Sequence, residues 1–148
     1  MRSDTWQTLH VQEDGHLVVV RIRSAVPPGI LQTRYPIVAS IYWPVDPETA
    51  SGMPTDRVLD KMLEMEDRLG AMDGPAIGFM MFSITGNQRK EWTWYVQDAD
   101  AFLSALGDHL ADMETLPMNI ETGPAGDDWD AYELMSASAV ELEDGYLA

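Results

Sequence analysis

The stretch AIGFMMFSITGNQRKEWTWYV, residues 76–96, decides the fold of this chain. Its first part, Ala76 to Thr85, is apolar on both faces, which is typical of a strand buried on two sides or of a strand at an interface. Gly86-Asn87-Gln88 predicts a turn, and Lys90 to Val96 predicts a strand that returns antiparallel to the first. The sequence therefore predicts a central hairpin with further elements on either side of it.

The segments around this hairpin alternate between strand and helix patterns. Pro36 to Trp43 is rich in β-branched and aromatic residues and predicts a strand. Pro54 is expected to open a helix that runs to about Leu69, and Asp98 to cap a second helix from about Ala99 to Asp112. Pro117 to Thr122 predicts a last strand. From residue 36 the order is strand, helix, strand, strand, helix, strand, which is typical of the ferredoxin-like split β-α-β-β-α-β fold of the α+β class.

An N-terminal hairpin precedes this core. Trp6 to Glu13 and His16 to Arg23 flank Asp14-Gly15, a strong signal for a type I′ turn. A two-residue turn at that point pairs Trp6 with Arg23, so we expect the guanidinium of Arg23 over the indole ring.

The chain is predicted to form a single domain over residues 1–148. Its parts are the N-terminal hairpin (5–24), the ferredoxin-like core (36–122), a C-terminal cover (126–136) and an acidic tail (137–148). Both helices are expected to cover one face of the sheet. The other face must be covered by the hairpin, by the C-terminal segment or by a second copy of the protein.

Charge is the sharpest compositional feature. The chain has 25 acidic and 9 basic residues among 148, and a net charge of −16. Residues 91–148 contain no Lys or Arg, so nearly all of the excess negative charge lies there. Such a region repels phosphates, which argues against nucleic acid and favours a basic protein, a polyamine or divalent cations. Acidity also keeps proteins soluble and suits a saline habitat, so both interpretations stay open.

Several classes of function have no signal in the sequence. There is no cysteine, which excludes disulfides and thiolate chemistry. No apolar run approaches the length of a membrane span and no leader pattern opens the chain, so a cytoplasmic protein without membrane association is expected. No catalytic, metal-binding or cofactor motif is present. We therefore assign no catalytic residue, metal or cofactor, and favour a non-enzymatic role.

Two groups of residues are candidates for binding. Trp92 and Trp94 share one face of their strand and either fill the core under the helices or anchor a ligand on an open sheet face together with Tyr95 and Arg89. The acidic turn GDDWDAYEL, residues 126–134, either caps a short helix or offers carboxylates to a cation, with its aromatic residues packed on the sheet. The candidate binding residues are Arg89, Trp92, Trp94, Tyr95, Asp127, Asp128, Trp129, Asp130 and Tyr132.

Residues 84–98 resemble the signature of a bacterial family, the domain of unknown function numbered 695. The matching residues are Thr85, Asn87, Arg89, Tyr95 and Asp98. Trp6, Gly52-Met53-Pro54 and Trp129-x-x-Tyr132 also fit, so the resemblance covers residues 5 to 135. The departures are Gln88, where a turn glycine is usual, and Trp where Phe or Tyr is usual.

The resemblance implies a ferredoxin-like α+β core and no established activity. The acidic C-terminal Trp-Asp-x-Tyr is also similar, at the level of fold, to the ribonuclease-activity regulator B family. The favoured hypothesis is an acidic binding or regulatory domain that associates with a basic protein partner. The alternative is a small-molecule-binding protein or cofactor-free enzyme that uses the open sheet face around Trp92, Trp94 and Tyr95. A homodimer is also predicted, in which Arg89-Lys90 and other basic residues meet the acidic half of a second copy.

Overall fold

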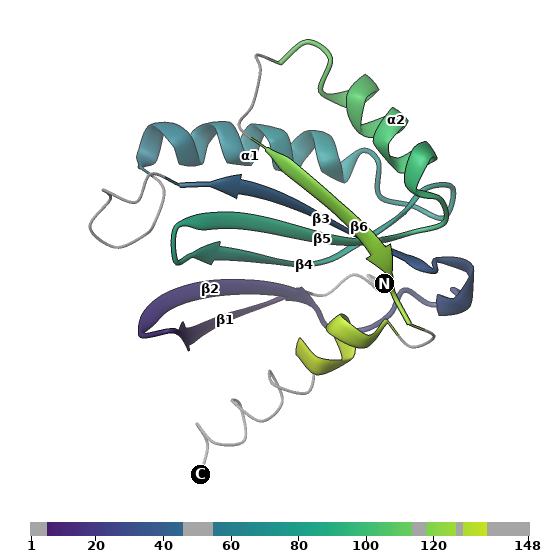
Figure 1. Cartoon of the computed structure of the whole chain (residues 1–148), viewed down its shortest axis with the longest axis horizontal. Helices are drawn as coiled ribbons and strands as arrows, with labels where there is room; N and C mark the ends of the chain where they lie inside the picture. The colour runs from purple at the N-terminus through teal and green to yellow at the C-terminus, as the bar shows by residue number, and fades with distance from the viewer. Residues whose placement is uncertain (1–5, 46–54, 114–117, 127–128, 136–148) are drawn as a thin grey trace.

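The computed structural model describes residues 6–45, 55–113, 118–126 and 129–135. It shows an α+β protein with one six-stranded antiparallel sheet (Figure 1). The elements are β1 (Trp6–Glu13), β2 (His16–Arg23), η1 (Gln32–Arg34), β3 (Ile37–Pro44), α1 (Asp56–Gly70), β4 (Gly78–Gly86), β5 (Arg89–Val96), α2 (Ala99–His109) and β6 (Asn119–Pro124). Predictions for Pro54, Pro117 and the acidic tail fall outside the described residues.

The order of the strands across the sheet is β1-β2-β4-β5-β3-β6. The ferredoxin-like core consists of β3, β4, β5 and β6. Across the sheet these four strands lie in the order β4-β5-β3-β6, so the first core strand, β3, lies between the third, β5, and the last, β6. Every pair of neighbours is antiparallel. This order is consistent with the predicted ferredoxin-like arrangement, and the α+β class is confirmed. The N-terminal hairpin extends the sheet beyond β4.

The N-terminal hairpin has the predicted register, with Trp6 opposite Arg23. Asp14 and Gly15 both have positive φ, at 50° and 80°, as a type I′ turn requires. The Arg23 guanidinium carbon lies 5.1 Å from the centre of the Trp6 ring. Local sequence therefore determined this hairpin, because the turn type fixes which residues stand opposite one another.

Both helices bury one stripe of side chains. In α1, Met62, Met65 and Leu69 are buried, as their spacing predicts. In α2, the carboxylate of Asp98 accepts a hydrogen bond from the backbone N–H of Ala101 at 2.8 Å, which confirms the predicted N-cap. The two stripes pack on the same face of the sheet, above it in Figure 1.

Trp92 and Trp94 of β5 lie beneath these helices. Both are fully buried and belong to the core cluster that joins α1, α2, β3 and β5. The rings of Trp94 and Phe102 lie 5.3 Å apart. The core interpretation of the two tryptophans is therefore the one that the structure shows.

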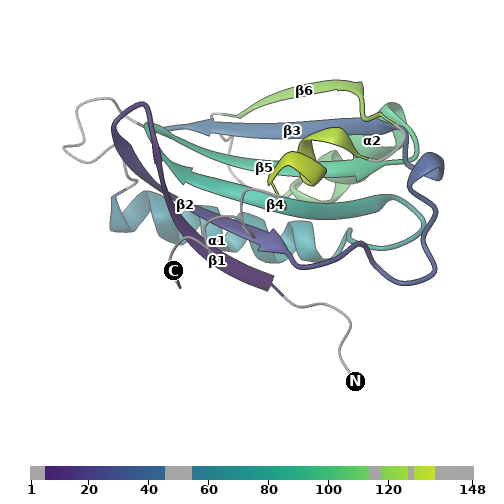
Figure 2. The same ribbon diagram turned by 90° about the horizontal axis from the view of Figure 1, so that it is seen from below.

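The opposite face of the sheet is partly covered by the chain's own C-terminal segment. Residues 130–135 form a short helical segment, which lies across this face in Figure 2. Trp129 stacks on Tyr95 of β5, with ring centres 4.6 Å apart and planes 8° apart. The Tyr95 hydroxyl also accepts a hydrogen bond from the N–H of Tyr132 at 3.0 Å. Of the three covers predicted for this face, the C-terminal segment is therefore the one that covers Tyr95.

The β4–β5 turn retains the conformation of a glycine turn without a glycine at its second position. Asn87 and Gln88 have φ of 49° and 69°, a region that costs an L-residue other than glycine roughly 1 kcal/mol. Gln88 is exposed, and its backbone carbonyl accepts from Val45 at 2.8 Å, a bond that glycine would keep. The departure from the family pattern at this position therefore leaves the strand pairing intact.

Gln88→Gly should raise the free energy of unfolding by about 0.5 kcal/mol, since relief of the positive φ exceeds the added entropy of the unfolded chain. Urea denaturation measures this change. Thr33→Gly, at an exposed position in η1, is the control and should be destabilising. A loss of stability in Gln88→Gly would contradict the turn conformation.

Candidate binding site at the open end of the sheet

The sheet face opposite α1 and α2 changes character along the strands. At one end, Val38, Tyr95 and Phe79 stand side by side in the register and belong to the apolar cluster that Trp129 completes. At the other end of the same face, β5, β3 and β6 carry polar residues, whereas β4 continues the apolar cluster with Phe82 and Ile84. This polar end is the candidate site.

The register places the polar side chains in rows. Asn119, Tyr42 and Glu91 stand opposite one another on β6, β3 and β5, and the next row contains Glu121, Ser40 and Thr93. Alternate residues of a strand point to the same face, and directly opposite residues are neighbours, with Cβ atoms about 5 Å apart. Three strands that are separate in the sequence thus bring these side chains together.

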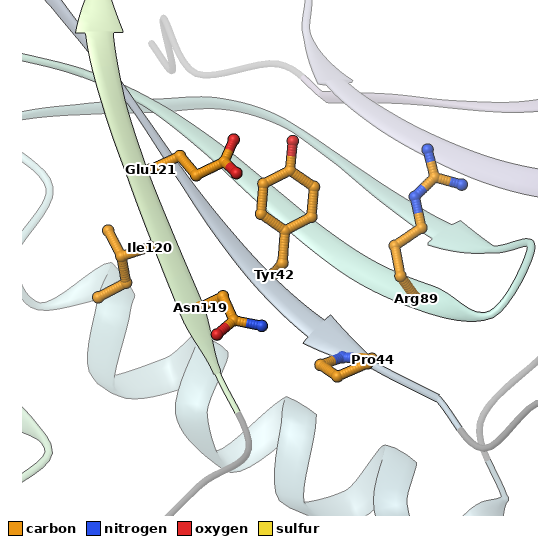
Figure 3. A pocket seen from close by; sticks show the side chains of 6 residues that line it. All are labelled: Tyr42, Pro44, Arg89, Asn119, Ile120 and Glu121. Carbon is orange, nitrogen blue, oxygen red and sulfur yellow. The ribbon is translucent and has the colours of Figure 1, made fainter.

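A pocket of about 530 Å³ opens over these rows. It is lined by Tyr42, Pro44, Arg89, Asn119, Ile120 and Glu121 (Figure 3). In Figure 3 the carboxylate of Glu121 points toward the Tyr42 ring, and Arg89 lies on the other side of that ring. Asn119 and Glu121 are exposed, whereas Tyr42 and Arg89 are partly buried. The pocket therefore has a polar wall on β6 that an incoming group can reach.

Arg89 is held by partners within the chain. Its Nη1 and Nη2 atoms donate to the two carboxylate oxygens of Glu13 at 2.6 and 3.0 Å. Nη1 also donates to the carbonyl of Gly86 at 3.1 Å, and Nε lies 3.5 Å from Glu91. Asn87 donates to the same Glu13 carboxylate at 2.9 Å. The guanidinium thus joins β1, β4 and β5, and its charge is already neutralised.

Two titratable groups next to Arg89 have shifted pKa values. Burial raises the pKa of Glu91, and the nearby carboxylates of Glu13 and Glu121 add to the effect, although Arg89 opposes it. The pKa of Tyr42 is also raised, first by burial and then by the charges of Glu91 and Glu121. In contrast, hydrogen bonds from Arg89 and then Asn87 lower the pKa of Glu13. The negative charges of the site therefore disfavour ionisation of the Tyr42 hydroxyl.

The side chains around this pocket are predominantly negative and polar. Three carboxylates, from Glu13, Glu91 and Glu121, stand against the single positive charge of Arg89. The lining also offers the amide of Asn119, the phenol of Tyr42 and the apolar ring of Pro44. Groups of this kind bind a cation by charge, by accepted hydrogen bonds and by the face of the aromatic ring.

Among the predicted site residues that the structure describes, only Arg89 lines the pocket. Trp92 and Trp94 point to the opposite face, and the indole Nε1 of Trp92 donates to Glu66 on α1 at 2.9 Å. The prediction that they lie on an open sheet face is wrong, because β5 alternates and its tryptophans fill the space under the helices. Tyr95 does lie on the other face, but it is buried under Trp129.

The predicted site residues of the C-terminal turn are partly buried in the fold and partly exposed. Trp129 and Tyr132 are buried against the sheet, and the Tyr132 hydroxyl donates to the carbonyl of Arg23 at 2.7 Å. Asp130 is exposed. Asp127 and Asp128 lie outside the described residues, so their proposed binding role stays a prediction. The aromatic pair of this turn serves as part of the fold.

The neighbouring cation Lys90 lies on the helix side of the sheet. Its ammonium donates to Thr85 Oγ1 at 2.8 Å and lies 3.6 Å from a carboxylate oxygen of Glu66. Burial lowers its pKa, against the opposing effect of Glu66. Arg89 and Lys90 thus both have partners inside the chain. The homodimer that was predicted from their position stays a prediction.

Sequence reasoning missed the residues of the pocket on β3 and β6. Tyr42, Asn119 and Glu121 were not singled out, and neither was Glu91 on β5. The sequence pattern that could have indicated this site is the alternation of side chains along β5. Arg89, Glu91 and Thr93 point to the face of the sheet opposite to that of Trp92 and Trp94. Only the pairing of β3 with both β5 and β6 shows that polar residues of three strands meet.

The described part of the chain has two further properties that bear on function. No group of three His, Asp or Glu side chains within it is arranged to hold a metal ion. None of its helices combines the length and apolar character that a membrane crossing requires.

Comparison with known proteins agrees with the resemblance found in the sequence. A model of a family of unknown function, DUF695, matches residues 4–135. The chain matches no curated protein and no solved structure. Since the family model spans most of the chain, including every strand and helix described above, the protein belongs to the DUF695 family.

Proposed function

We propose that this protein is a non-enzymatic binding domain that associates with a basic protein partner through the open end of its sheet. The observation that carries the proposal is the excess of carboxylates around the pocket. Glu91 and Glu121 stand beside Tyr42, and the only Arg or Lys among the lining residues, Arg89, is engaged by Glu13. A cation that approaches this end meets negative charge in excess of the positive charge of the described lining.

The net charge of −16 supports the same conclusion. Long-range attraction of this kind raises the rate at which a basic partner is met, and it weakens as salt screens the charges. The alternative, a small molecule bound around Trp92 and Trp94, is less well supported, because both side chains are buried in the core under the helices. The pocket that is present is polar and open, whereas sites for small apolar ligands are mostly apolar and enclosed.

The test is affinity capture from the native lysate at roughly 50 and 500 mM salt, values that bracket weak and strong screening. The wild-type protein is compared with Glu121→Lys, which reverses one charge on the pocket wall. Asp67→Lys, at an exposed position on α1, makes the same change of charge away from the pocket and is the control. Mass spectrometry identifies what each protein retains.

We expect one stoichiometric basic protein that is retained by the wild type and by Asp67→Lys at low salt, and is released at high salt. Glu121→Lys should lose it. Equal retention by both variants would show that binding follows overall charge rather than this site. If the wild type retains nothing specific at either salt, the acidity serves solubility and the proposal fails.

A further inference from the structure

We propose that the pocket receives the guanidinium group of a single arginine side chain. This inference rests on the proposed function and names the group of the basic partner that the site recognises. The pocket has the three components that such a group requires: a planar acceptor with charge, an aromatic face and an apolar surface for the methylene stem. Each comes from a different part of the lining.

The acceptors lie on β6. Glu121 contributes an exposed carboxylate and Asn119 an amide oxygen, two residues apart on the same face of the strand. A guanidinium has five N–H donors in a flat fork that matches a carboxylate with two parallel hydrogen bonds. An ammonium is a compact point charge and makes no such paired contact. The acceptors therefore favour arginine over lysine.

The aromatic face comes from β3. Tyr42 stands directly opposite Asn119 and between the two carboxylates of Glu91 and Glu121. Burial, and then the charges of these carboxylates, raises its pKa. In Figure 3 its ring stands between Glu121 and Arg89. A guanidinium that stacks on such a ring gains the attraction of the π face, and it gives up less hydration than an ammonium does.

The apolar surface comes from Pro44, which is exposed next to Tyr42 in the lining. An arginine side chain buries its methylene groups along surfaces of this kind while its charged end reaches polar partners. The side chain of Ile120 packs on the core under the helices, so the pocket itself offers one apolar side chain beside its polar groups.

The same chemistry is already present within the chain. On this face of the sheet Arg89 forms a paired contact with the Glu13 carboxylate. Elsewhere in the sheet, the guanidinium groups of Arg21 and Arg23 lie 5.5 and 5.1 Å from the Trp6 ring centre. An anionic ligand is disfavoured at this pocket. It would have to compete with Glu13 and Glu91 for the N–H donors of Arg89. Its approach is opposed by the charge of Glu121.

The experiment titrates the isotopically labelled protein with three capped tripeptides, Gly-Arg-Gly, Gly-Lys-Gly and Gly-citrulline-Gly, and follows backbone amide shifts by NMR. Citrulline keeps the planar shape and removes the charge. We expect Gly-Arg-Gly to bind with a Kd of about 1–10 mM, as one side chain at an open site allows. The shifts should concentrate at residues 119–121 and at Tyr42. The lysine peptide should bind about 5-fold more weakly, and the citrulline peptide should not bind measurably.

Two pocket variants and one control complete the design. Glu121→Gln keeps the shape and removes the charge, and Tyr42→Leu removes the aromatic face; each should weaken Gly-Arg-Gly about 5-fold or more. Asp67→Asn, on the exposed side of α1, should leave binding unchanged. Thermal unfolding of each variant verifies that it is folded.

Equal affinity for the arginine and lysine peptides, or binding that Glu121→Gln leaves intact, would overturn the assignment of a guanidinium. That result leaves the proposed function standing if Glu121→Lys still abolishes capture of the basic protein. Conversely, specific binding of Gly-Arg-Gly without any Glu121-dependent capture would support the guanidinium site and overturn the protein partner. The two failures are thus distinguishable.

Discussion

Trp129→Ala is expected to lower the free energy of unfolding by about 3–5 kcal/mol, the range for removal of a large aromatic side chain from a core. Trp129 is fully buried, stacks on Tyr95 and lies edge-on to Tyr35 and Tyr132. Its indole N–H donates to the carbonyls of Gln32 and Tyr35, each at 3.1 Å. The substitution removes the side chain that attaches the C-terminal segment to the sheet.

The measurement is urea denaturation of the wild type and the variant at one pH, followed by circular dichroism. Leu134→Ala is the control, because Leu134 belongs to the same segment but is 72 % exposed, and it should change stability by less than about 0.5 kcal/mol. If both variants had the same small effect, the packing of this segment on the sheet would be contradicted. Trp129→Phe should fall between them, since it keeps ring contact and loses both hydrogen bonds.

Arg89→Met is expected to lower the free energy of unfolding by about 2–3 kcal/mol at neutral pH. Removal of one partner from a well-buried ion pair costs about 3–5 kcal/mol, and here Glu13 is partly exposed, so the expected cost is smaller. Methionine keeps most of the methylene stem. The substitution leaves Glu91, whose side chain is only 14 % exposed, without its nearby cation.

The cost of Arg89→Met should depend on pH. The pKa of Glu13 is lowered by Arg89, so the stability from that pair is present above the ordinary carboxyl pKa and is lost as the pH falls through the folded value. The pKa of Glu91 is raised by burial, so its ionised form is unfavourable in the folded state and its protonation on acidification favours folding. Both effects make the substitution more costly at about pH 7 than at about pH 4.

Urea denaturation at several pH values between these limits tests the expectation. Arg57→Met is the control, because it removes the same charge from an exposed position on α1. It should change stability little and without this pH dependence. A cost for Arg89→Met that stays constant from pH 4 to pH 7 would contradict the role of the two carboxylates.

The elements that could be predicted from sequence are those with a local cause. The turn at Asp14-Gly15 fixed the register of β1 and β2 through its backbone geometry. Val58, Met62, Met65 and Leu69 stand three or four positions apart in the sequence, a spacing that predicts one apolar side of a helix. In α1 the last three of them are buried. The alternation of strand and helix patterns predicted the order of the core elements.

The candidate site was harder to predict because its residues come from three strands. Alternation in β5 separates Arg89, Glu91 and Tyr95 from Trp92 and Trp94, but it does not say which set faces the helices. That choice depends on the apolar faces of α1 and α2, which cover the tryptophans. The alternating aromatic residues predict the strand β5 correctly, but nothing in the pattern indicates that the polar residues of its other face meet those of β3 and β6.

At Trp129, tertiary contacts override the local backbone preference of the residue. Its φ of 54° lies in a region that a bulky residue rarely adopts, and nothing in the acidic turn predicts it. The cost is offset by burial against Tyr95 and by two hydrogen bonds.

By itself the sequence determined the elements, the register of the N-terminal hairpin and the excess of negative charge, because turns, periodicity and composition are local properties. Only the tertiary structure decided which face of each strand is buried, where the C-terminal segment packs, and that Tyr42, Glu91 and Glu121 meet at one pocket. These depend on contacts between residues far apart in the chain, whose energy is realised only when the sheet and both of its covers are assembled.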